Sequence, residues 1–161
     1  MVGPDVVERV VRKQLTFCLL LGLAAFGTLA AQDKAPEKTS GSRTLKVKLN
    51  YTGSGTVDDK HKIVVFVFDS PDFMQGNAMP VGSQSSPSKN GSVTFSDLAS
   101  SPVYLTAVFD PAGQYDGMSA PPSGSSLGLY GKTPGTPDPV KIDPGDSVEV
   151  ELAFDDTAKM P

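Results

Sequence analysis

The sequence is poor in the residue types that most often carry protein chemistry. Its 161 residues include no tryptophan, one cysteine and one histidine. A single cysteine excludes a disulfide within the chain, so a folded domain here depends on its hydrophobic core. One histidine, His61, without further histidine or cysteine ligands does not make a transition-metal site of the usual kind. Because no nucleophile–base pair is recognisable either, the sequence predicts a protein that is not an enzyme.

Basic residues are also few. The chain has 14 Lys and Arg against 18 Asp and Glu, a formal net charge of −4, which disfavours a nucleic-acid partner. What the sequence does contain is 16 glycines and 14 prolines, with short apolar runs between them. This composition favours β-structure with long loops, and the length suits one domain with a sizeable core.

The first part of the chain has the pattern of a secretory signal peptide. Three basic residues precede an apolar run at 15–31 that ends in the small residues Ala30 and Ala31. We expect a signal peptide over residues 1–31, cleaved after Ala30 or Ala31, and therefore an exported protein. The alternative is an uncleaved membrane anchor, since about 17 residues is close to the length that spans a bilayer. A mature chain without cysteine favours a bacterial periplasmic or extracellular location.

The remaining apolar runs are typical of β-strands. Some alternate with polar residues, as in half-buried strands, and others are continuous, as in strands buried on both faces. We expect an all-β fold, a six- to seven-stranded antiparallel sandwich of the prealbumin or immunoglobulin-like sort. It would occupy residues 44–155, after a flexible tether at 32–43 and before a tail at 156–161. The expected strands are 45–51, 63–68, 93–95, 103–109, 140–142 and 148–154.

Three of these strands end in Phe-Asp, at Asp69, Asp110 and Asp155. If successive strands run antiparallel, the second, fourth and sixth expected strands all finish at one end of the sandwich. The two long loops, 70–91 and 110–139, would open at that same end. We therefore expect these carboxylates to gather there.

Such a cluster suggests calcium, which prefers six to eight oxygen ligands. The candidate ligands are Asp69, Asp110, Asp116 and Asp155. The alternative is that each aspartate caps a turn by accepting hydrogen bonds from nearby backbone N–H groups. No other cofactor is expected.

Three aromatic residues in the polar loops are the candidate ligand-binding residues: Phe73, Tyr115 and Tyr130. Such rings either fold back on the sandwich or form a binding surface for a carbohydrate or an envelope protein. The string Gly124-Ser-Ser-Leu-Gly128 fits the Gly-x-Ser-x-Gly motif of hydrolases, but it lies in a Gly- and Pro-rich loop and His61 precedes it in the chain. We interpret it as a chance match.

The segment from Val93 to Asp110 carries a family resemblance. It contains an apolar residue and Phe95, then Asp97-Leu98, a short turn, Tyr104, alternating apolar residues and a final Asp. This order resembles transthyretin-like, carboxypeptidase-regulatory-like β-sandwich domains. It is also similar to a family of secreted bacterial proteins of uncharacterised function, whose Pro…Tyr-Gly element would correspond to Pro121-Pro122 and Tyr130-Gly131. The acidic loop of that family is reduced here to residues 110–117. The resemblance implies a sandwich used for binding or as a structural addition, without catalysis.

The sequence thus predicts an exported, non-catalytic binding or accessory module of the cell envelope, acting through loops 70–91 and 110–139. One alternative is a structural or assembly protein that docks through a sheet edge such as Thr44–Tyr51. A hydrolase is a more distant alternative. The expected partners are an envelope protein or a carbohydrate, and contact with the membrane only through an uncleaved signal segment.

Overall fold

The structure is a computed structural model that describes residues 41–76 and 78–161. The expected signal peptide at 1–31 and most of the expected tether at 32–43 lie outside the described residues. Within the described residues, no helix has the length and apolar character needed to cross a membrane. The described chain is all-β, with two sheets that form a sandwich, as expected.

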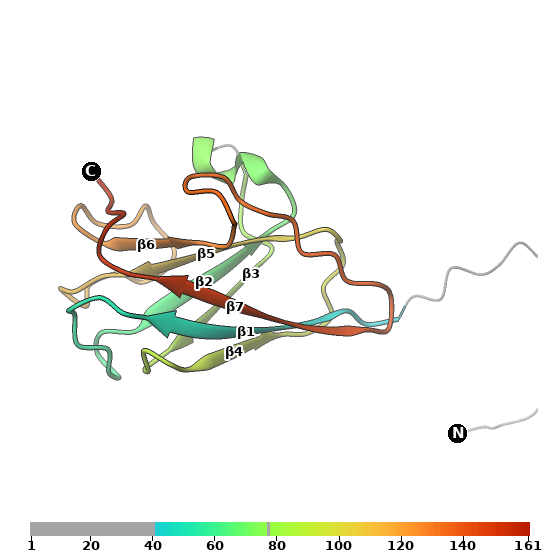
Figure 1. Cartoon of the computed structure of the whole chain (residues 1–161), viewed down its shortest axis with the longest axis horizontal. Helices are drawn as coiled ribbons and strands as arrows, with labels where there is room; N and C mark the ends of the chain where they lie inside the picture. The colour runs from blue at the N-terminus through green and yellow to red at the C-terminus, as the bar shows by residue number, and fades with distance from the viewer. Residues whose placement is uncertain (1–40, 77) are drawn as a thin grey trace, which may run out of the picture. The chain divides into compact units, whose positions relative to one another are not determined.

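The strands divide into a sheet of three and a sheet of four (Figure 1). The three-stranded sheet has the order β4-β1-β7 and the four-stranded sheet has the order β3-β2-β5-β6. A short 3-10 helix, η1 (Pro71–Gln75), follows β2. The strands are β1 (Thr44–Tyr51), β2 (Ile63–Phe68), β3 (Gly82–Ser86), β4 (Ser92–Phe95), β5 (Tyr104–Phe109), β6 (Ser126–Leu129) and β7 (Ser147–Phe154).

The main core lies between the two sheets. Alternate residues of β1, namely Leu45, Val47, Leu49 and Tyr51, are buried there, because successive side chains of a strand point to opposite faces. β2 is buried on both faces. Its odd-numbered residues join the main core, whereas Phe66 and Phe68 belong to a second apolar cluster on the outer face of the four-stranded sheet.

β1 is the central strand of its sheet, so the expectation that Thr44–Tyr51 forms a docking edge is wrong. It pairs antiparallel with β4 through contacts such as Val47↔Val93. On its other side it pairs in parallel with β7 along its whole length, from Thr44↔Ser147 to Tyr51↔Phe154. The backbone of β1 therefore has a partner strand on both sides, and the sandwich is not wholly antiparallel.

Two strands occur where the sequence predicted only loop. β3 lies inside the expected loop 70–91, and β6 lies inside the expected loop 110–139. Residues 140–142, by contrast, contribute a single bridge, Val103↔Val140, rather than a strand. These changes alter the direction in which each later strand runs.

The expected gathering of the Phe-Asp endings is consequently wrong. β2 and β5 are antiparallel, with Ile63 beside Phe109 and Phe68 beside Tyr104, so Asp69 and Asp110 follow opposite ends of the sheet. The endings at Asp110 and Asp155 do lie at the same end of the sandwich. The rings of Phe109 and Phe154, which precede them, have centroids 4.9 Å and 4.8 Å from that of the Tyr51 ring. The sequence analysis did not predict β3, which lies between β2 and β5 in the chain. This extra strand reverses the direction in which β5 was expected to run.

The C-terminal residues pair with the edge of β6. The N–H of Leu127 donates to the carbonyl of Ala158 at 2.8 Å, and the N–H of Met160 donates to the carbonyl of Ser125 at 2.9 Å. Just before them, the Asp156 carboxylate accepts from the hydroxyls of Tyr51 and Ser126. Residues 156–161 therefore have a structural role beyond that of the expected tail.

Candidate functional site

A groove with a volume of about 390 Å³ lies on the outer face of the four-stranded sheet, at the end where β5 finishes. Its residues come from three segments that are distant in the sequence: the turn before β2, strand β3 and the loop after β5. Val64 of β2 contributes an apolar part of the lining. The other lining residues are Asp59, Lys60, Lys62, Ser83, Gln84, Ser85, Asp110, Gly113, Tyr115, Asp116 and Gly117.

Asp58 organises the first wall, the turn that leads into β2. One of its carboxylate oxygens accepts from the backbone N–H groups of Lys60 at 2.9 Å and His61 at 2.8 Å. The same oxygen lies 2.8 Å from Nδ1 of the His61 ring. The backbone and ring hydrogen bonds from His61, followed by that from Lys60, lower the pKa of Asp58 below its usual value. This wall is therefore held by an ionised carboxylate.

Asp110 organises the second wall in the same way. Its side chain is 5% exposed, and one oxygen accepts from the N–H of Ala112 at 2.9 Å. The other oxygen accepts from the N–H groups of Gln114 at 2.7 Å and Tyr115 at 3.0 Å. Three backbone donors thus surround the carboxylate, which folds residues 110–115 into a tight loop.

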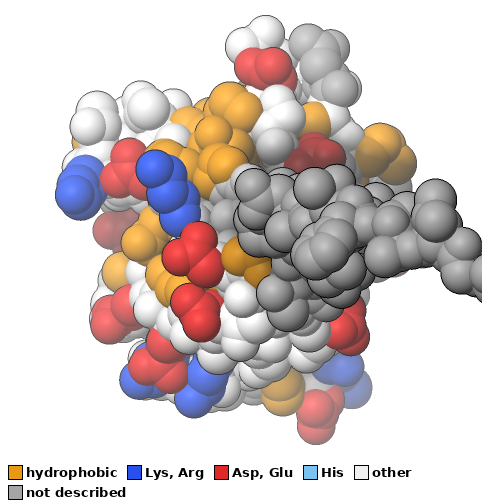
Figure 2. Space-filling model, turned by 90° about the vertical axis from the view of Figure 1, so that its right-hand side faces the viewer, with side chains coloured by type: hydrophobic (Ala, Val, Ile, Leu, Met, Phe, Trp, Pro, Cys, Tyr) orange, Lys and Arg blue, Asp and Glu red, His pale blue; other side chains and the backbone are white. Residues whose placement is uncertain are grey.

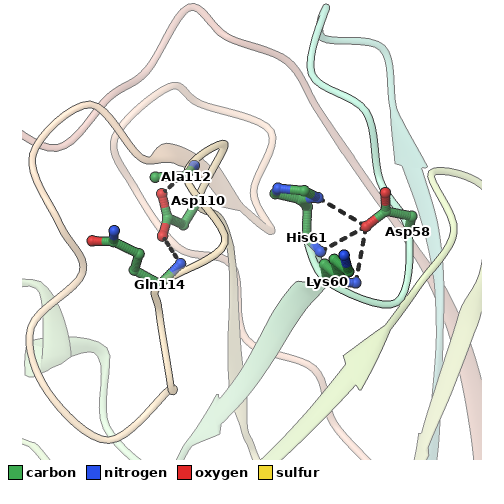
Figure 3. Close-up of polar contacts among 6 residues, drawn as sticks. All are labelled: Asp58, Lys60, His61, Asp110, Ala112 and Gln114. Carbon is green, nitrogen blue, oxygen red and sulfur yellow. Dashed lines mark hydrogen bonds and ion pairs between the residues drawn. The ribbon is translucent and has the colours of Figure 1, made fainter.

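The two walls are in direct contact. In Figure 3 the ring of His61 lies between Asp58 and the loop that contains Asp110 and Ala112. Gly113 explains how close they come, because a Cβ at this position would lie 2.8 Å from the His61 ring and 2.9 Å from the Lys60 carbonyl oxygen. Its φ of 67° also favours glycine. The contact fixes the two turns relative to each other, so the shape of this end of the groove is set before any ligand binds.

Tyr115 and Asp116, two of the residues predicted from the sequence, line the groove. The Tyr115 ring packs against Phe66, with centroids 6.2 Å apart and planes inclined at 60°. Burial, and to a smaller extent the charge of Asp116, raises the pKa of Tyr115. Asp116 itself accepts from the N–H groups of Met118 at 2.9 Å and Ser119 at 3.4 Å, and these contacts lower its pKa. Tyr115 therefore remains a neutral phenol and Asp116 a charged carboxylate near neutral pH.

The other two predicted aromatic residues lie outside the groove. Phe73, on η1, stacks on Phe68 with ring centroids 4.3 Å apart, which places it over the outer face near the far end of β2. Tyr130 packs against the main core, and its N–H donates to the carbonyl of Leu105. The structure therefore does not combine Phe73, Tyr115 and Tyr130 into one binding surface.

The four candidate calcium ligands do not come together either. Asp69 follows β2 at the opposite end from Asp110. The Asp155 carboxylate accepts a hydrogen bond from the N–H of Thr157 at 2.8 Å. The carboxylates of Asp110 and Asp116 likewise accept hydrogen bonds from backbone N–H groups of their own loops. Among the described residues, no group of three or more His, Cys, Asp or Glu side chains is placed to hold a metal ion. Three of the four aspartates thus have the turn-capping geometry that the sequence offered as the alternative.

The hydrolase-like string lies at the start of β6 rather than at an exposed turn. Ser126 is 1% exposed, and its hydroxyl donates to Asp156 at 2.7 Å. The neighbouring Ser125 is fully buried. The hydroxyl of Ser126 is therefore committed to a structural hydrogen bond and is closed to a substrate.

Sequence reasoning missed several exposed residues of the groove, among them Lys60, Lys62, Ser83, Gln84 and Ser85. Lysine, serine and glutamine in a turn or on an edge strand resemble any solvated segment, so their residue types gave no signal. The sequence did contain one signal for this wall of the groove, namely Asp58. An aspartate can accept a hydrogen bond from the backbone N–H two residues later, so Asp58 predicts an Asx turn that includes Lys60.

Comparisons with protein-family models, with curated proteins and with solved structures found no match to this chain.

Proposed function

We propose that this protein is an exported, non-catalytic binding module of the cell envelope and that the groove on its four-stranded sheet is the binding site. The proposal includes the prealbumin or immunoglobulin-like type of sandwich, the signal peptide at 1–31 and the periplasmic or extracellular location expected from the sequence. The likeness of residues 93–110 to transthyretin-like domains, and to a family of secreted bacterial proteins, supports the same assignment.

The observation that carries the proposal is that the groove joins the two loop regions expected to bind. Ser83, Gln84 and Ser85 come from 70–91, and Tyr115 and Asp116 come from 110–139. The walls are held by the carboxylates of Asp58 and Asp110 rather than by a ligand. A concave site whose walls are fixed in advance loses little conformational entropy on binding.

The test uses a pair of exposed groove residues that make no side-chain contact on which the fold depends. The double variant Lys62→Ala, Ser85→Ala removes two polar groups from the lining. The matched control, Lys132→Ala, Ser123→Ala, removes the same two residue types from exposed positions outside the groove. Tyr115→Ala is less suitable, because losing the contact with Phe66 would also destabilise the fold.

Binding is measured by co-sedimentation of the purified protein with washed bacterial envelope fractions. We expect the wild type and the control variant to sediment with a fraction, and the groove variant to bind at least tenfold more weakly with an unchanged melting temperature. Equal binding of the groove variant, or no binding of the wild type to any fraction, would overturn the proposal.

A further inference from the structure

We infer that the ligand of this groove is a neutral oligosaccharide segment; the inference rests on the proposed function and specifies its ligand. It begins from the polar groups that the groove presents. The hydroxyls of Ser83 and Ser85 both donate and accept hydrogen bonds, whereas the ammonium groups of Lys60 and Lys62 only donate. A ligand with many hydroxyls, each of which is a donor and an acceptor, matches this mixture.

The charges of the lining favour a neutral ligand. Lys60 and Lys62 are exposed, and neither forms an ion pair with another described residue. Three carboxylates, of Asp59, Asp110 and Asp116, line the same groove. With both signs present within one small site, neither a polyanion nor a polycation gains a consistent electrostatic attraction.

The groove also offers apolar contact beside its polar groups. Val64 is half-buried in the lining, and Tyr115, another lining residue, has its ring packed on Phe66. A sugar ring has C–H groups on its faces and hydroxyls around its edge, so it can contact both kinds of surface at once. The aromatic ring adds contact area at low conformational cost because Phe66 already fixes its position.

The position of the groove disfavours an extended peptide. Peptides that bind sheets commonly pair their backbone with an edge strand. Here Ser83 and Ser85 are opposite Phe66 and Val64 in the register, so their side chains belong to the outer face of the sheet. The ligand would therefore lie on this face between the walls. A volume of about 390 Å³ is at the lower end of the usual range for small-molecule sites, about 300–1,000 Å³, and suits a short stretch of a glycan.

The test is a titration of the purified protein followed by two-dimensional amide NMR. The probes are cellohexaose, maltohexaose and chitohexaose as neutral glycans, oligogalacturonate as an anionic glycan, and an unstructured Gly/Ser-rich peptide. We expect at least one neutral glycan to shift the amide signals of residues 59–62, 83–85 and 113–117. Its Kd should rise at least tenfold in the Lys62→Ala, Ser85→Ala variant and stay within twofold in the Lys132→Ala, Ser123→Ala control.

The outcomes separate this inference from the function on which it rests. If only oligogalacturonate or the peptide shifts the groove signals, or if none of the probes does, the assignment to a neutral glycan is overturned. Groove-dependent sedimentation with envelope fractions would in that case still support a binding module with a ligand of another class. If sedimentation is also lost or independent of the groove, both the inference and the proposed function fail.

Discussion

At the scale of single residues, aspartate carboxylates organise much of the irregular backbone. Asp58 and Asp110 each gather backbone N–H groups and so shape the two walls of the groove. Asp156 has a similar role next to the core. It accepts from the Tyr51 hydroxyl, from the Ser126 hydroxyl at 2.7 Å, and from the N–H and hydroxyl of Ser54 at 2.8 and 2.9 Å. This one side chain connects β1, β6 and the C-terminal residues.

We expect Asp156→Asn to lower the free energy of unfolding by about 1–3 kcal/mol, because an amide –NH₂ replaces one acceptor oxygen and faces a donor. Denaturant unfolding measures this change. Asp155→Asn is the matched control, since the Asp155 carboxylate is exposed and accepts from a single residue, Thr157; its unfolding midpoint should stay close to that of the wild type. Equal effects of the two substitutions would contradict the role given to Asp156.

The pH dependence of the same variant gives a second prediction. The hydrogen bonds from Tyr51 and Ser126, followed by that from the Ser54 N–H, hold the pKa of Asp156 well below its usual value. A lowered pKa in the folded state contributes stability above the unfolded pKa of about 4, and this contribution is lost as the pH falls towards the folded pKa. The stability difference between wild type and Asp156→Asn should therefore be constant above about pH 5 and shrink below about pH 4. A difference that grows on acidification would show that another group is responsible.

At the scale of secondary-structure elements, the sequence predicted the strands that carry the core. β1 and β7 alternate apolar and polar residues, β2 is a continuous apolar run, and β5 is apolar except for Thr106. These patterns are recognisable because the four strands supply most of the core. β3 reads Gly-Ser-Gln-Ser-Ser and was missed, since an edge strand with little buried surface needs no apolar side chains. β6 was missed because its short sequence, Ser-Leu-Gly-Leu, lies within a Gly- and Pro-rich segment.

Missing β3 also limited the prediction of the site. The Phe-Asp endings were recognised correctly as strand ends, but without β3 the direction of every later strand was assigned wrongly. The loop 110–139 was predicted to bind from its length and its aromatic residues, and Tyr115 and Asp116 of this loop line the groove. The contribution of Lys60, Lys62 and residues 83–85 depends on long-range strand pairing, which residue types alone do not indicate.

The C-terminal segment supplies an element-scale prediction. In Met160→Pro, the N–H that donates to the carbonyl of the buried Ser125 is removed, and this should cost about 1–3 kcal/mol of unfolding free energy. The exposed edge of β6 should also increase self-association, visible by size-exclusion chromatography at high protein concentration. Met160→Ala keeps the N–H and serves as the control. If Met160→Pro is as stable and as monomeric as Met160→Ala, the segment does not protect this edge.

At the scale of the whole molecule, the arrangement of charges predicts how the protein responds to added ions. Acidic and basic side chains are interspersed on the face shown in Figure 2, and Lys46 and Lys48 both contact Glu149 across the three-stranded sheet, with Lys46 at 3.0 Å. These pairs are exposed, so each contributes little to stability and is screened by salt.

Calcium is expected to leave the thermal stability unchanged. A ligand that binds only the folded state at about 100 times its Kd adds about 2.7 kcal/mol, which raises the melting temperature by several degrees. Because the oxygens of Asp110, Asp116 and Asp155 already accept hydrogen bonds from their own loops, we expect millimolar Ca²⁺ to shift the melt by less than 1 °C. Asp110→Asn should melt lower with or without calcium. A calcium-dependent rise that disappears in Asp110→Asn would restore a metal site at this loop.

The parallel pairing of β1 with β7 has a consequence for when this protein folds. Asn50 and Glu151, which hydrogen-bond across the two strands, are 101 residues apart in the chain. The hydrogen bonds between β1, the central strand of the three-stranded sheet, and β7 therefore cannot form until β7, the last strand of the chain, is present. A chain emerging from the ribosome would hold its first strand unpaired on one side until synthesis is almost finished. We therefore expect the three-stranded sheet to be completed only after the last strand has been synthesised, although β1 and β4 can pair earlier.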